Sequence, residues 1–236
     1  QSSSQSTDKA DGGHSSNGSG TDNANGTGGV GGTDGADGDN QDTVTDNPLK
    51  IVESGWSADQ QGYVHYAFAL RNTSKTQQVQ YPQITITGRA KDGSIVFSQT
   101  QALNMAFPNQ TVYDAGQAGE GTAPETVDFT VLNPDTYNVT EAQGTATFPI
   151  SGTSKIDNRD GGTTFNGEVR AVADGFKPSD GQQIKISLVL RNAQNAIIYG
   201  DIAFVDWPGN GRSTPFSITV YDLPKYVSYD LYAQIW

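Results

Sequence analysis

The chain of 236 residues has no cysteine, one methionine and only two histidines, His14 and His65. The absence of cysteine excludes disulfides, thiol catalysis and cysteine-bound zinc. A site with two histidine ligands is excluded after residue 48, where His65 is the only histidine. No apolar run approaches the roughly 18 residues that a membrane-spanning helix needs. We therefore expect no metal, no cofactor and no transmembrane segment.

Basic residues are also scarce, with 14 Lys and Arg against 26 Asp and Glu, which gives a formal net charge of −12. No basic stripe is present to neutralise phosphates, so we expect no nucleic-acid partner, and the same acidity disfavours docking on an anionic lipid surface. Eight aspartates and Lys9 in the first 48 residues contribute −7, which leaves −5 for the remaining residues.

Residues 1–48 have no aromatic residue and only Val30 and Val44 as sizeable apolar side chains, but 11 of the 28 glycines. So little apolar surface cannot offset the cost of ordering the backbone, about 1–2 kcal/mol per residue, and we expect a disordered linker. Four aspartates between Gly32 and Asp42 resemble the ligands of a calcium loop. Their spacing does not match D-x-[DN]-x-[DN]-G, so we interpret them as part of the linker.

The polar start QSSSQSTDKADGG is similar to the segment that follows the lipid-carrying cysteine of a bacterial lipoprotein. We expect an extracellular protein, held at the outer face of the cell membrane by a lipid anchor that precedes Gln1, or secreted. A flexible exported N-terminus without an anchor is the alternative interpretation.

Residues 183–207 give the clearest strand signal. In the first arm four aliphatic residues alternate with Lys185, Ser187, Val189 and Arg191, the period-two pattern of a strand with one buried face. The aliphatic residues are Ile184, Ile186, Leu188 and Leu190. The turn is predicted at 193–195, and Trp207-Pro208-Gly209 ends the second arm of the hairpin.

Similar patterns fill the chain from Leu49 onwards. Residues 49–56 predict a short strand with Leu49, Ile51 and Glu53 on one side, and residues 63–72 predict a strand with Val64, Tyr66, Phe68 and Leu70 on one face. Residues 79–101 predict a hairpin with its turn at Asp92-Gly93. Residues 145–150 predict the closing strand of this first block.

One segment is repeated. ITITGRAKDGSIVF at 84–97 is similar to ISLVLRNAQNAIIY at 186–199, and each has an isoleucine six residues after an arginine. A proline break follows each copy, at Pro108 and Pro208. We therefore predict an all-β fold of two tandem sandwiches, residues 49–150 and 151–236. One large sandwich with a chance similarity is the alternative.

Catalytic patterns are few. A Ser-His-Asp triad would have to use His65, which falls in the middle of a predicted strand, so we interpret it as an exposed or packed imidazole. The sequence does not exclude a pair of catalytic carboxylates. A sandwich-fold hydrolase is therefore kept as a further, less favoured alternative. The candidates are Glu53, Asp114, Glu120, Glu125, Asp128, Glu168, Asp174, Asp201, Asp206, Asp222 and Asp230. We predict that the chain is not an enzyme.

Aromatic side chains are the one binding hypothesis with named residues. Trp56, Trp207 and Trp236 lie near predicted strand ends, where exposed rings could stack on sugar faces as in a carbohydrate-binding module. The interpretation that we favour is that most of these rings fill the cores and the seam between the sandwiches. The three tryptophans are nevertheless the predicted ligand-binding residues.

The segment YVHYAFALRNTS, with Asn72-Thr73-Ser74 and the later Asp92-Gly93 turn, resembles the FxLYD-type immunoglobulin-like domains of Gram-positive exported proteins and lipoproteins. The F-x-L-Y-D core is replaced by Ile84 to Gly88 in the first copy and by Leu188-Val189-Leu190 in the second. The resemblance implies two immunoglobulin-like sandwiches and a non-catalytic module. We expect a monomer that interacts with another surface or extracellular protein, or with a cell-wall polymer or glycan.

Overall fold

Strands form every long element of the computed structural model, which describes residues 46–236. The predicted linker and its aspartate cluster lie almost wholly outside these residues. The strands are β1 Leu49–Ala58, β2 Val64–Asn72, β3 Gln77–Gln80, β4 Gln83–Arg89, β5 Ile95–Ala102, β6 Met105–Ala106, β7 Thr111–Ala118, β8 Thr126–Val131, β9 Val139–Glu141, β10 Thr145–Thr147, β11 Ile150–Asp157, β12 Thr163–Arg170, β13 Val172–Asp174, β14 Gln183–Arg191, β15 Ile197–Asp206, β16 Ser213–Val220 and β17 Ser228–Ile235. One 3-10 turn, η1 Thr136–Asn138, precedes β9. The predicted all-β class is confirmed, and between residues 46 and 236 no helix could cross a membrane.

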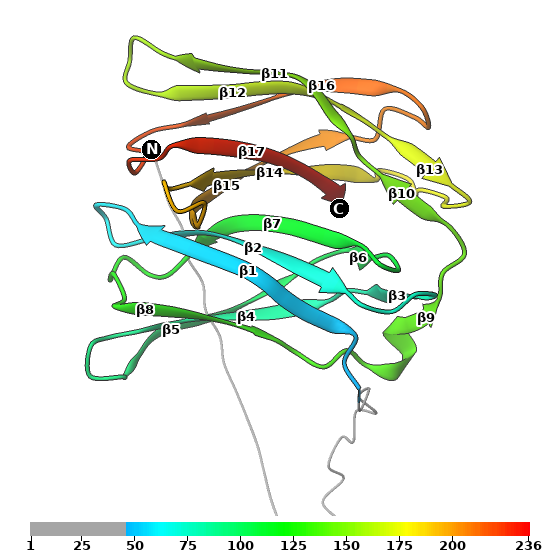
Figure 1. The fold of residues 1–236 in the computed structure, drawn as a ribbon, viewed down its shortest axis with the longest axis horizontal. Coiled ribbons are helices and arrows are strands. Elements are labelled where there is room, and N and C mark those ends of the chain that lie inside the picture. Colours follow the sequence, from blue (N-terminus) through cyan, green and yellow to red (C-terminus); the bar gives the residue numbers. More distant parts are fainter. Residues whose placement is uncertain (1–45) are drawn as a thin grey trace, which may run out of the picture. The chain divides into compact units, whose positions relative to one another are not determined.

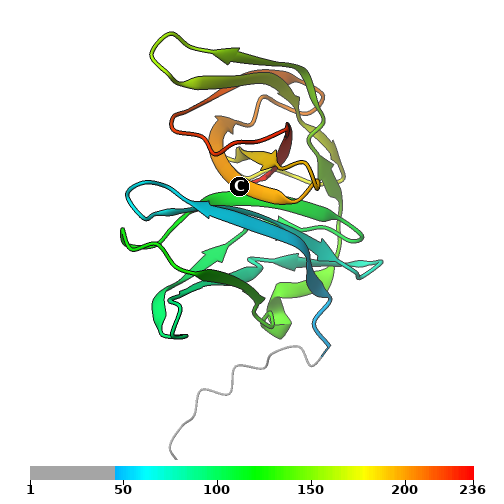
Figure 2. The same ribbon diagram turned by 60° about the vertical axis from the view of Figure 1, so that its left-hand side comes forward.

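Four antiparallel three-stranded sheets lie in layers (Figure 1). Their strand orders, from one outer layer to the other, are β5-β4-β8, β1-β2-β7, β15-β14-β17 and β11-β12-β16. The turned view shows the same succession, with the C-terminal end of β17 at the level where the two inner layers meet (Figure 2). Two small sheets, β6-β3-β9 and β10-β13, lie where the chain crosses from the first pair of layers to the second.

The strand pairing of the first pair of layers recurs in the second. In the sheets β5-β4-β8 and β15-β14-β17, each pair is matched by a pair 102 positions later: Ile84–Val131 by Ile186–Ala233, and Arg89–Ile95 by Arg191–Ile197. Both hairpins also carry a register shift directly before the arginine. The sequence similarity of 84–97 and 186–199 therefore corresponds to equivalent hairpins.

Three apolar clusters fill the spaces between the layers. The first-half cluster contains Val64, Tyr66, Phe68, Leu70, Ile84 and Ile86, and the second-half cluster contains Phe165, Ile184, Ile186, Leu188, Leu190 and Ile218. The third is a seam cluster of Ala67, Ala115, Val189 and Ile197, between β1-β2-β7 and β15-β14-β17. Gly55 and Gly200, together with Ala67 and Ala115 of the seam cluster, let the two inner sheets come close together.

The seam corrects the prediction of one buried face for residues 183–191. Both faces of β14 are covered, and every residue after Gln183 is buried. Its polar residues Lys185, Ser187 and Arg191 point into the seam instead of into water. Alternation predicted the strand correctly, but it could not reveal that a second sheet covers the polar face.

Two further expectations need correction. A bulge between Ile51 and Glu53 turns Glu53 away from Ile51 and towards the seam, so these two residues do not share a side. The predicted closing strand of the first block pairs elsewhere, because Thr145–Thr147 forms β10 beside β13, and Ile150 already begins β11. The predicted boundary at residue 150 stays a prediction.

Candidate functional site: a hollow lined by amides beside the seam

A cavity of about 470 Å³ lies between the two halves of the described chain, next to the crossing from β9 to β10. We call it the amide hollow, because three of its eight lining residues are glutamines. Its lining is Gln78, Gln80, Met105, Gln143, Gly144, Gly175, Phe176 and Lys177. The volume is within the range of clefts that hold small ligands, and such clefts are common at interfaces between domains.

The first wall is β3, which carries Gln78 and Gln80 on alternate positions and pairs with both β6 and β9. Val79 between them is fully buried in the first-half core, so the period of the strand directs both glutamines to the opposite side. Within residues 46–236, the side-chain amides of these two glutamines and of Gln143 make no hydrogen bond to protein. Each amide therefore keeps its carbonyl acceptor and its two N–H donors free for a ligand.

The second wall consists of the backbone segments that flank β10 and β13. Gly144 and Gly175 let these segments approach each other: a Cβ at Gly144 would lie 2.2 Å from the Phe176 nitrogen. Gly175 also has a φ of 72°, which favours glycine. Phe176 is held edge-on to Phe107 from the first half at 5.5 Å, and this contact fixes the wall across the seam.

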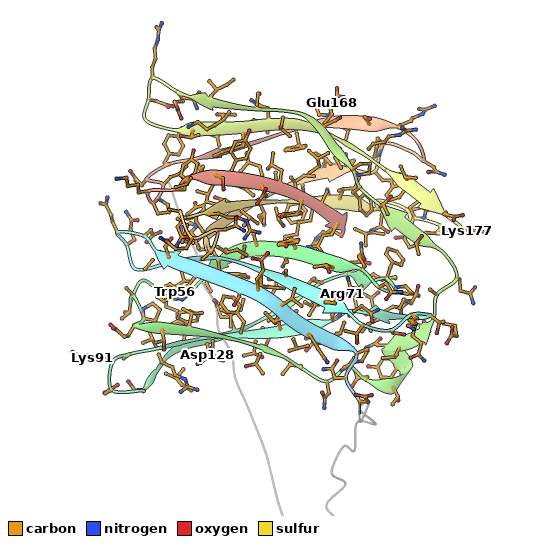
Figure 3. The ribbon with its side chains drawn as sticks, viewed as in Figure 1. Trp56, Arg71, Lys91, Asp128, Glu168 and Lys177 are labelled. Carbon is orange, nitrogen blue, oxygen red and sulfur yellow. The ribbon has the colours of Figure 1, made fainter. Side chains whose placement is uncertain are left out.

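The charge of the hollow contrasts with that of the chain. Lys177 is exposed and is the one charged residue of the lining, which contains no carboxylate. It lies at the end of the layers where β13 ends (Figure 3). The chain has a formal net charge of −12, and this hollow, with a lysine and no carboxylate in its lining, is a local site where an anionic ligand meets less repulsion.

The structure does not bring the three predicted ligand-binding tryptophans together. Trp56 packs on the first-half core, at the opposite end of the layers from Lys177 (Figure 3). Trp207 packs on the second-half core, edge-on to Phe148 at 5.8 Å. Trp236 lines a second, smaller hollow, together with Tyr81, Ala102, Leu103 and Asn104.

Two carboxylates near the seam, the buried Asp114 and the half-buried Glu53, are paired with cations. Asp114 is fully buried on β7, accepts a bond of 2.6 Å from Lys185 and one of 2.7 Å from Gln234, and its pKa is raised by burial although Lys185 opposes this. Glu53 accepts two bonds from Arg191, whose guanidinium lowers the pKa of that carboxyl. A glycoside hydrolase needs an acid with a raised pKa in an open cleft, and neither residue provides this combination.

His65 is packed against a neighbouring ring, which was one of the two predicted alternatives, exposed or packed. Its ring stacks on Tyr199 at 4.7 Å, and its Nε2 lies 3.2 Å from Asp59. Between residues 46 and 236, no group of three or more His, Asp or Glu side chains could hold a metal ion.

The comparisons with known proteins give no family. No family model matches the chain, and no curated protein matches it. Among solved structures, the exo-chitosanase CsxA of Amycolatopsis orientalis matches with 10% identity and a TM-score of 0.21 over 75% of this chain. This chain spans 24% of that protein's length, and so low a score carries no argument about function.

Proposed function

We propose that the chain is a non-catalytic binding module of a bacterial cell surface, and that it holds a wall polymer in the amide hollow. The observation that supports this proposal is the set of three glutamine amides without protein partners, from β3 and from the segment before β10. A polymer rich in hydroxyl or amide groups offers both donors and acceptors to such side chains.

The shape and charge of the hollow favour a polymer chain over a folded protein as the occupant. A protein partner generally needs a contact of more than about 1,000 Å², whereas a hollow of 470 Å³ fits a few polymer units. The absence of a lining carboxylate and the presence of Lys177 suit an uncharged or an anionic polymer.

Titration calorimetry with the full chain tests the proposal, with muramidase-solubilised wall polymer of a Gram-positive bacterium as the probe. We expect the double variant Gln80→Ala/Gln143→Ala to bind at least tenfold more weakly than the unchanged chain. The matched control is Gln60→Ala/Gln61→Ala, which removes two exposed amides from the β1–β2 turn. No heat of binding with any wall fraction, or equal losses in both variants, would overturn the proposal.

A second candidate is a protein partner that adds a strand to β11. β11 pairs only with β12, and all of its residues except Ile150 are exposed, so its other edge is open. Hydrogen exchange distinguishes the two candidates. Slower exchange along β11 on addition of the partner would favour the protein, and slower exchange around β3 and β10 would favour the polymer.

A further inference from the structure

A second, smaller hollow has a volume of about 210 Å³, and some of its lining residues are next in sequence to residues of the amide hollow. Its lining is Tyr81, Ala102, Leu103, Asn104 and Trp236. The two hollows are lined by successive rungs of one short ladder: Gln80 pairs with Met105 in the lining of the amide hollow, and the Tyr81 N–H donates to the Asn104 carbonyl at 2.9 Å in the lining of the smaller one.

Tyr81 is held in an unfavourable backbone conformation. Its φ is 50°, in the left-handed region that bulky residues rarely adopt, and it precedes Pro82, which further disfavours helical conformations. Its side chain is also 58% exposed, so core packing does not explain the choice of tyrosine. Asparagine or glycine would fit this turn with less strain, and the ring at this position points to a binding role.

Trp236, which belongs to the second half of the chain, lines the smaller hollow together with Tyr81. Its backbone pairs with Gln183 in the ladder of β14 and β17, and the Lys185 ammonium lies 4.5 Å from the centre of its ring. Phe204 adds a tilted contact at 5.5 Å. These contacts fix the indole before any ligand arrives, so binding costs little side-chain entropy.

We infer that Tyr81 and Trp236 form a stacking subsite for one sugar ring, so that the polymer held by this chain is a glycan. The inference rests on the proposed function and specifies its ligand. The C–H faces of a pyranose are apolar and stack on aromatic rings, while its rim carries hydroxyls that the Asn104 amide can bond. The lining holds no charged side chain, which selects an uncharged ring.

The inference is tested by measuring binding of the full chain to an array of uncharged and N-acetylated oligosaccharides of four to six units. The affinity for the best binder is then measured by titration calorimetry. Tyr81→Asn removes the ring and keeps a residue that tolerates a positive φ. We expect at least tenfold weaker binding and a Tm equal to or above that of the unchanged chain, because backbone strain is relieved. The matched control, Tyr137→Asn, removes a tyrosine that is 72% exposed elsewhere and should leave affinity unchanged.

The outcomes separate the inference from the proposed function. Binding that weakens in Gln80→Ala/Gln143→Ala but not in Tyr81→Asn or Trp236→Leu would overturn the stacking subsite alone. The absence of binding to wall polymer and to every saccharide would overturn both. Preferential binding of peptides with aromatic side chains, lost in Tyr81→Asn, would show that the two rings hold a peptide and would overturn the assignment to a glycan.

Discussion

Arg191 on β14 binds Glu53 on β1 through two hydrogen bonds of 2.8 and 2.9 Å, although 138 positions separate the two residues. The same guanidinium donates to Asp230 at 2.7 Å and to the Asn195 carbonyl at 3.0 Å. The bonds from Arg191 to Asp230 and to Asn195 stay within the second half of the chain. They have equivalents 102 positions earlier, where Arg89 donates to Asp128 and to the Gly93 carbonyl. Both hairpins therefore have an equivalent arginine. In the second hairpin this arginine also binds Glu53 across the seam.

The first prediction concerns Arg191. Its side chain is 6% exposed, so Arg191→Met removes a buried partner from Glu53 and Asp230. Breaking a buried pair costs about 3–5 kcal/mol, and we expect the lower end because Glu53 and Asp230 regain water. Urea unfolding measures the change. Arg89→Met is the matched control on the exposed face and should cost less than about 1 kcal/mol. Equal costs would contradict a special role of the seam arginine.

The second prediction concerns acid. Because Arg191 holds the pKa of Glu53 below its ordinary value of 4.5, the folded state favours the charged carboxylate. This contribution to stability is present above pH 4.5 and is lost as the pH falls through the folded pKa. We expect Glu53→Gln to be less stable than the unchanged chain at pH 7, and this difference should shrink below pH 4.5. A difference that stays constant from pH 7 to pH 3 would contradict the linkage.

The strand pattern was predictable because the central strand of each inner layer has a run of four apolar residues on one face. Phe68 and Leu70 on β2, and Leu188 and Leu190 on β14, identified these strands and their inward faces. The seam was not predictable, because small and charged residues are interspersed among the apolar residues that face it. Ala67 and Lys185 look like the solvent face of a half-buried strand, and only the approach of the second sheet makes them buried.

The candidate site was less predictable than the fold. Its amides come from β3 and from the segment before β10, which are distant in sequence and meet only where the chain crosses between the halves. Of the three tryptophans predicted to bind a ligand, Trp236 lines the smaller hollow, and Trp56 and Trp207 pack on the cores; ligand binding by them stays a prediction.

The third prediction concerns the close approach of the inner sheets. A Cβ at Gly200 on β15 would lie 2.3 Å from the Tyr66 carbonyl oxygen and 2.7 Å from the Ala115 Cβ. Gly200→Ser introduces the residue found at the equivalent position of the first hairpin, Ser98, which is exposed. We expect a loss of about 1–3 kcal/mol or more, because the sheets must separate.

Differential scanning calorimetry measures this loss and also reports on cooperativity. The reciprocal control Ser98→Gly should cost no more than about 1 kcal/mol, since only a strand propensity and one hydroxyl contact are lost. In the unchanged chain we expect both halves to unfold in one transition, and in Gly200→Ser we expect that transition to broaden or split. An unchanged Tm in Gly200→Ser would contradict the tight seam.

The fourth prediction concerns the buried pair of Asp114 and Lys185, whose side chains are 0% and 2% exposed. Lys185→Met leaves the carboxylate buried without its cation and should cost about 3–5 kcal/mol at pH 7. Because burial already raises the pKa of Asp114, this cost should shrink as the pH is lowered and the carboxyl takes up a proton.

The double variant Lys185→Met/Asp114→Asn keeps an oxygen for Gln234 and carries no charge, so it should lose much less stability than the sum of the losses in the single variants. A double-mutant cycle by urea unfolding checks this, and additive losses would show that the two charges do not stabilise each other across the seam.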